Sequence, residues 1–129
     1  MIVVDTNVMA YLWLPGDRTP QAERLLQRDP AWNAPLLWRS EFRNVLAGCL
    51  SRGDLDLETA LQIADEAEGQ MRGSEFAVPS AQVLARAAGS GCSACDCEFV
   101  VLAEELAVPL ITSDEKVLRA FPSVARRLE

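Results

Sequence analysis

Close to the start of the chain stands Ile2-Val3-Val4-Asp5-Thr6-Asn7, and its pattern of an apolar run ending in an acid returns at Leu110-Ile111-Thr112-Ser113-Asp114. Each apolar run is rich in β-branched residues and too short for a helix, which predicts a buried strand. Each acid is followed by a segment with helical character. Because the carboxyl ends of parallel strands share one ligand-binding edge of the sheet, we expect Asp5 and Asp114 to meet there. The alternative is that each acid only caps its helix.

The remaining chain alternates between predicted strands and predicted helices, which is typical of an α/β domain with a mainly parallel sheet. The expected strands cover residues 2–4, 32–34, 75–78 and 109–112. The expected helices cover residues 5–12, 19–28, 37–51, 56–71, 80–88, 94–107 and 114–120, with Thr19, Ser93 and Ser113 or Asp114 as caps and Gly53 and Gly89 as stops. Residues 121–129 are assigned to no element. With 129 residues, we expect one domain covering 1–129.

Composition excludes several kinds of chemistry. The net charge is −7. The chain has no histidine, which excludes Ser-His-Asp catalysis, Cys-His catalysis and the usual His-containing zinc sites. The negative charge argues against coating nucleic acid by bulk electrostatics. No apolar stretch is long enough to span a bilayer and no signal peptide is visible, so we expect a cytoplasmic protein with reduced cysteines and no membrane contact. Carboxylates remain as the agents of any reaction.

Two further acids fall on apolar helix faces, where an unpaired charge is costly. Helical spacing places Glu41 beside Leu37, Trp38, Val45 and Cys49, and Asp96 beside Phe99, Val100, Ala103 and Ala107, with Glu98 and Glu105 on the solvated side. Such acids must be ion-paired, protonated or bound to a cation. The alternatives are a structural salt bridge for Glu41 and stabilisation by the helix dipole for Asp96.

Four converging acids would repel one another unless a hard divalent cation lay between them. Oxygen-only ligands suit Mg²⁺ or Mn²⁺, which can polarise a phosphate and activate water. Thr6, Asn7, Thr112 and Ser113 flank the strand-end acids and could orient ligands or water; we favour Asn7 and Thr112, and helix capping is the alternative for all four. The predicted metal site is therefore Asp5, Glu41, Asp96 and Asp114.

Four blocks of the sequence resemble PIN-domain ribonucleases, and most of all the VapC toxins of prokaryotic toxin–antitoxin pairs. In order along the chain they are Asp5-Thr6-Asn7-Val8, Ser40-Glu41-Phe42-Arg43-Asn44-Val45-Leu46, Asp96 with Phe99-Val100-Val101-Leu102-Ala103-Glu104, and Leu110-Ile111-Thr112-Ser113-Asp114. The resemblance implies a three-layer α/β/α fold, an Mg²⁺ or Mn²⁺ site, and endonucleolytic cleavage of RNA. It also implies a homodimer and neutralisation by a small antitoxin, with Asp5, Glu41, Asp96 and Asp114 at the family's acidic positions.

The chain departs from this family in the run Cys92-Ser93-Ala94-Cys95-Asp96-Cys97. Three cysteines without histidine are a poor zinc pattern, so small side chains at a crowded helix start are the favoured interpretation. For RNA contact the basic candidates are Arg18, Arg39, Arg43, Arg72, Lys116 and Arg119, with Lys116 and Arg119 nearest in sequence to Asp114. The apolar face of helix 56–71 is assigned to the core rather than to an antitoxin groove; its members are Leu57, Leu61, Ala64, Ala67 and Met71.

Other functions compete with the toxin-type ribonuclease. One is an RNA-processing nuclease of the same fold without an antitoxin, and another is an inactive binding module. A phosphatase with an aspartate nucleophile needs a second Asp two residues after Asp5, where Asn7 stands. A phosphate-accepting receiver domain needs an acid pair at that strand end, which is absent.

Overall fold

Five strands form one parallel sheet at the centre of the computed structural model, which describes residues 1–129. The strands are β1 (Ile2–Val4), β2 (Trp32–Pro35), β3 (Glu75–Phe76), β4 (Leu110–Thr112) and β5 (Ala125–Arg127), in the spatial order β3-β2-β1-β4-β5. In the central strand β1, Val3 pairs with Asn33 on one side and with Leu110 on the other. Every pairing is parallel, so the sheet that we expected to be mainly parallel is parallel throughout.

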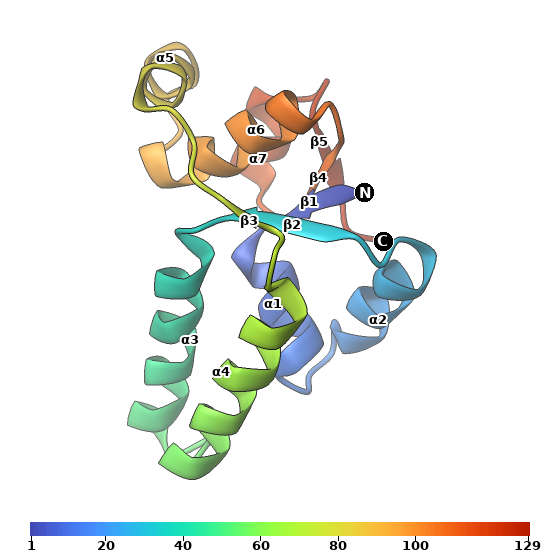
Figure 1. Cartoon of the computed structure of the whole chain (residues 1–129), viewed down its shortest axis with the longest axis vertical. Coiled ribbons are helices and arrows are strands. Elements are labelled where there is room, and N and C mark those ends of the chain that lie inside the picture. The colour runs from blue at the N-terminus through green and yellow to red at the C-terminus, as the bar shows by residue number, and fades with distance from the viewer.

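Seven helices cover the two faces of this sheet (Figure 1). On one side lie α1 (Thr6–Trp13), α2 (Thr19–Arg28), α3 (Trp38–Arg52) and α4 (Leu57–Met71), and on the other lie α5 (Ser80–Ser90), α6 (Ala94–Leu106) and α7 (Glu115–Ala120). Helices α3 and α4 extend side by side away from the sheet. The three-layer α/β/α fold is therefore confirmed. None of the helices is both long and apolar enough to cross a membrane.

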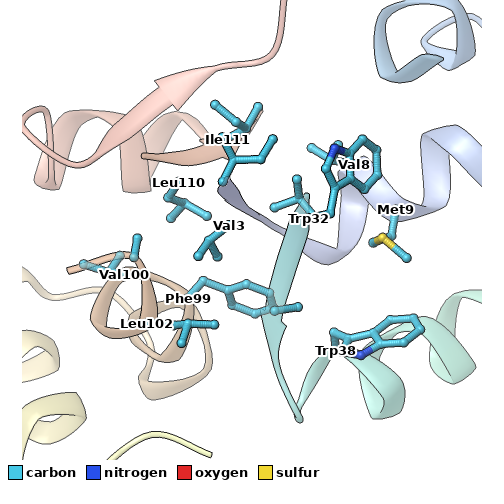
Figure 2. Close-up of a cluster of buried hydrophobic side chains, with 14 of the residues drawn as sticks. Val3, Val8, Met9, Trp32, Trp38, Phe99, Val100, Leu102, Leu110 and Ile111 are labelled. Atoms are coloured by element: carbon cyan, nitrogen blue, oxygen red, sulfur yellow. The ribbon is translucent and has the colours of Figure 1, made fainter. Parts of the chain in front are cut away.

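The core lies between the sheet and the helices on both of its faces (Figure 2). Val3 of β1 and Leu110 of β4 are buried together with Phe99 and Leu102 of α6. All three residues of β1 are buried, because a parallel sheet covered on both faces has no solvated side. On the opposite side Trp38 is fully buried, and its ring meets that of Phe42 at 5.6 Å between centroids.

Side-chain caps fix the first residues of helices α1, α6 and α7. The Asp5 carboxylate accepts a hydrogen bond from Val8 N at the start of α1, and the Ser93 hydroxyl accepts one from Asp96 N at the start of α6. Asp114, not Ser113, caps α7. These bonds satisfy amide groups that have no partner inside the helix. The predicted cap Thr19 is instead the first residue of α2, and its hydroxyl donates to the Tyr11 carbonyl.

The predicted end of α5 and the predicted core face of α4 were wrong in detail. Helix α5 continues through Gly89 and ends at Gly91, whose φ of +74° is the left-handed conformation that favours glycine. On α4, Leu57 and Leu61 do not join the core; they are 61% and 62% exposed. The buried residues of α4 are Ala60, Ala67 and Met71, and Ile63 and Ala64 are partly buried against the core.

The end of α5 gives a paired test of stability. Gly89→Ala should raise the free energy of unfolding by about 0.5–1 kcal/mol, because the helical site has open space for a Cβ and alanine favours helix. Gly91→Ala should lower it by about 1 kcal/mol, because its positive φ is strained for alanine. Urea denaturation measures both; equal effects of the two substitutions would contradict the observed helix end.

Candidate active site

A pocket of about 250 Å³ opens at the carboxyl edge of the sheet and brings together the four acids predicted from sequence. Asp5 follows β1, Asp114 follows β4, and Glu41 and Asp96 lie in the first turns of α3 and α6. The other residues that line the pocket are Thr6, Asn7, Asn44, Val45, Phe99, Leu110, Thr112 and Val117. The role of the four acids as metal ligands stays a prediction.

Asp5 is the most constrained of the four. One carboxylate oxygen accepts a hydrogen bond from Val8 N at 2.9 Å, and the other accepts one from the Thr112 hydroxyl. Burial raises the pKa of this carboxyl group above its ordinary value, against the opposing effect of these hydrogen bonds, and the charge of Asp114 raises it further. The ionised group is therefore desolvated and faces a second negative charge, which is unfavourable without a cation.

Asp114 caps α7 as well as lining the pocket. Its Oδ1 accepts hydrogen bonds from Lys116 N at 2.9 Å and from Val117 N at 3.2 Å. The Thr112 hydroxyl, which donates to Asp5, also accepts a bond from Asp114 N at 3.0 Å. One threonine thus links the two strand-end acids. The cap leaves Asp114 Oδ2 without a hydrogen-bond donor, so the capping role and a metal role do not exclude each other.

Glu41 reaches the pocket from the edge of the buried face of α3. Its Oε1 accepts a 2.7 Å hydrogen bond from the Thr6 hydroxyl. Burial raises the pKa of Glu41, and the charges of Asp96 and Asp5 add to this effect. The apolar neighbours predicted for Glu41 are confirmed in part. Trp38 and Cys49 are buried, whereas Leu37 and Val45 are only half-buried. The face that α3 buries also includes Phe42 and Leu46.

Helix α3 is held near its start by an ion-pair network with α4 and β3. The Arg39 guanidinium donates to Glu75 through Nε at 2.6 Å and through Nη2 at 2.8 Å, and to Glu68 through Nη1 at 2.5 Å. Trp38 Nε1 also donates to Glu75 at 2.7 Å. Because Glu68 and Glu75 occupy the donor groups of Arg39, the prediction that this residue contacts RNA is not supported. The network anchors the helix turn that carries Glu41.

Asp96 presents a carboxylate that accepts no hydrogen bond and forms no ion pair in the protein. Phe99, Val100 and Ala103 are buried as predicted, but Ala107 is an exposed residue with a left-handed conformation that ends α6. Glu98 also differs from the prediction: it is half-buried, and burial raises its pKa. Helix α6 is enclosed on more sides than a surface helix with one apolar stripe.

The donor set of the pocket fits a hard divalent cation that retains part of its water. No Lys or Arg forms an ion pair with any of the four acids, so hydrogen bonds alone, and no positive side chain, stabilise the charge of the half-buried Asp5. No group of three or more Cys, Asp or Glu side chains is arranged closely enough to hold a metal directly. Mg²⁺ commonly takes one or two carboxylates and keeps several waters. The arrangement therefore suits a cation held by one or two of these carboxylates and by water.

The polar residues beside the acids differ in their exposure to solvent. Thr6 and Thr112 are buried and bond to Glu41 and Asp5, whereas Asn7 is exposed and lines the pocket. Sequence reasoning missed Asn44 as a lining residue. Its position three residues after Glu41 on the same helix was the available signal. Cys92 and Cys97 are buried and Cys95 is exposed, and they form no metal-binding group.

The basic residues predicted to contact substrate lie outside the pocket. Lys116 and Arg119 are exposed on α7 and do not line it. They therefore remain candidates only for a more distant part of a substrate.

The chain belongs to the PIN domain family, whose model matches residues 2–124. A curated relative, Ribonuclease VapC3 of Pyrobaculum aerophilum, is 27% identical over 126 residues, which covers 95% of this chain and 96% of the relative.

Solved structures share the fold. PAE2754 from Pyrobaculum aerophilum has a TM-score of 0.78 at 17% identity, over 98% of this chain and 83% of the other. FitAcB from Neisseria gonorrhoeae has a TM-score of 0.71 at 18% identity, over 97% and 96% of the two chains. FitAB bound to the IR36 DNA fragment has a TM-score of 0.73 at 16% identity, over 98% and 94%.

Charge crowding in the metal-free pocket predicts that the Glu41→Gln protein is more stable than wild type in EDTA at pH 7. The pKa of Glu41 is higher in the folded protein than its ordinary value of 4.5, so ionised Glu41 disfavours folding above the folded pKa. The Thr6 hydroxyl can still donate to the Gln amide oxygen. As the pH falls through the folded pKa towards 4.5, wild-type Glu41 takes up a proton and the difference should disappear.

Urea denaturation in EDTA from pH 4 to 8 measures this effect. The matched control is Glu105→Gln, an exposed acid on α6, which should leave stability unchanged. A Glu41→Gln protein that is less stable than wild type at pH 7 would show that charge crowding does not dominate the pocket.

Proposed function

We propose that this protein is an Mg²⁺- or Mn²⁺-dependent endoribonuclease that acts as the toxin of a toxin–antitoxin pair in the cytoplasm. The observation that carries the proposal is the pocket lined by Asp5, Glu41, Asp96 and Asp114 with no basic side chain among its lining residues. Membership of the PIN domain family and the ribonuclease relative support the reaction type.

In this proposal Asp5 and Asp96 hold the cation, and Glu41 and Asp114 act on it through bound water. Bound Mg²⁺ or Mn²⁺ would neutralise the scissile phosphate and make a water molecule more acidic. Thr112 orients Asp5 through its hydroxyl, and Thr6 orients Glu41. Asn7 is exposed at the pocket and can donate its amide to a water or a phosphate oxygen. The carboxylates that do not contact the cation accept a proton from the attacking water.

The chemistry of the surface supports two protein partners. An antitoxin with a basic segment suits a chain of net charge −7 and an acidic pocket. Leu57 and Leu61 of α4 are exposed large apolar residues that an antitoxin or a second copy of the chain could cover. The homodimer, like the antitoxin, is proposed from the resemblance to VapC toxins.

Purified protein should cleave RNA internally with Mg²⁺ or Mn²⁺, and EDTA should stop the reaction. Asp5→Asn should lower the cleavage rate by at least about 100-fold, because a neutral amide binds a hard cation much more weakly than a carboxylate does. Gel analysis of end-labelled RNA fragments measures the rate and shows whether cleavage is internal.

The matched control is Asp65→Asn, which removes an exposed acid on α4 that does not line the pocket and should leave the rate unchanged. Cleavage that persists in EDTA would contradict metal dependence. Full activity of Asp5→Asn would place the catalytic site elsewhere, and inactivity of the wild type on all RNA tested would favour a binding module.

A further inference from the structure

Arg18 lies in the turn between α1 and α2 with its guanidinium over the ring of Tyr11. The carbon at the centre of the guanidinium is 4.9 Å from the ring centroid, which is within cation–π range. The turn itself is fixed by Thr19, whose hydroxyl accepts from Gly16 N at 3.0 Å and donates to the Tyr11 carbonyl at 2.6 Å. Arg18 is therefore held in place without an acidic partner.

Tyr11 connects this cation to the edge of the acidic pocket. Its hydroxyl lies 3.1 Å from the hydroxyl of Ser113, in a hydrogen bond between the two side chains. Ser113 directly precedes Asp114 in the sequence, and Asp114 lines the pocket. Tyr11 stands four residues after Asn7, so the two share one face of α1, and Asn7 lines the pocket. Contacts between side chains thus lead from Arg18 through Tyr11 to Ser113, the residue beside Asp114.

Most of the hydrogen-bonding capacity of Arg18 is unused. Only its Nε is engaged, with Gln21 Oε1 at 2.9 Å, and neither terminal nitrogen has an acceptor in the protein. Arg18 forms no ion pair, whereas the guanidinium groups of four other arginines are paired with acids: Arg39, Arg52, Arg86 and Arg127. A guanidinium with two free, oriented donor groups matches the oxygens of a phosphate.

We propose that Arg18 binds a backbone phosphate of the RNA next to the cleaved bond, with the strand crossing the Asn7 face of α1. This inference rests on the proposed nuclease function. Phosphates approaching four acids are repelled, and the pocket lining contains no basic residue to offset this. Arg18 supplies positive charge at the rim, and the Tyr11 ring and Gln21 orient it before the RNA arrives. Arg18 is thus a substrate-positioning residue, separate from the acids that carry out cleavage.

Steady-state cleavage of a short single-stranded RNA tests this role through the split between KM and kcat. Arg18→Ala should raise KM about five- to tenfold and leave kcat within about twofold, because the contact is made equally before and during reaction. The slope of log KM against log salt concentration should also fall by about 0.7, the value for one phosphate contact on a single strand. The matched control is Arg24→Ala, an exposed and unpaired arginine on α2, which should change neither quantity.

A measurement of RNA binding without cleavage can show whether the role of Arg18 fails independently of the proposed nuclease function. Fluorescence anisotropy with a labelled single-stranded RNA compares the Asp5→Asn protein with the Asp5→Asn/Arg18→Ala protein, neither of which needs to cleave. A five- to tenfold loss of affinity on removing Arg18 supports the inference even if no cleavage is found. An affinity and salt dependence that match those of Asp5→Asn/Arg24→Ala would overturn it.

Discussion

The burial of the Asp5 carboxylate without a positive partner is the constraint on which the site depends. Parallel pairing of β1 with β4 brings Asp5 and Asp114 to one edge of the sheet, and the first turns of α3 and α6 add Glu41 and Asp96. Burial and neighbouring negative charge raise the pKa of Asp5 and of Glu41. A bound divalent cation would relieve this repulsion, so the crowded acids, which destabilise the fold on their own, would favour cation binding.

The fold and the acids could largely be predicted from short-range patterns. Strands β1 and β4 are apolar runs that lead to acids, and rules for helix starts predicted the cap Ser93. For α7 these rules left Ser113 and Asp114 as alternatives, and Asp114 is the cap. The convergence of Asp5 and Asp114 follows from parallel topology alone, since all strands of such a sheet end at one edge. These features depend on residues close in sequence or on a rule that holds for the whole sheet.

What could not be predicted depends on contacts between distant segments. Arg39 resembles a free surface cation in the sequence, but Glu68 and Glu75, 29 and 36 residues away, occupy it. Periodicity placed Leu61 in the core, although α4 leaves that side chain exposed. Arg18 could be identified as basic, but its position over Tyr11 requires the fold of the α1–α2 turn. Helical spacing identifies a face and does not identify what covers it.

Binding of Mn²⁺ to the metal-free protein, followed by isothermal titration calorimetry, tests the central claim most directly. Wild type should bind Mn²⁺, and Asp5→Asn should bind it at least about tenfold more weakly, since the buried carboxylate loses its charge. Asp65→Asn, which alters an exposed acid outside the pocket, should bind as wild type does. Unchanged affinity and stoichiometry in Asp5→Asn would contradict the account, because the uncompensated charge of Asp5 would then have no part in holding a cation.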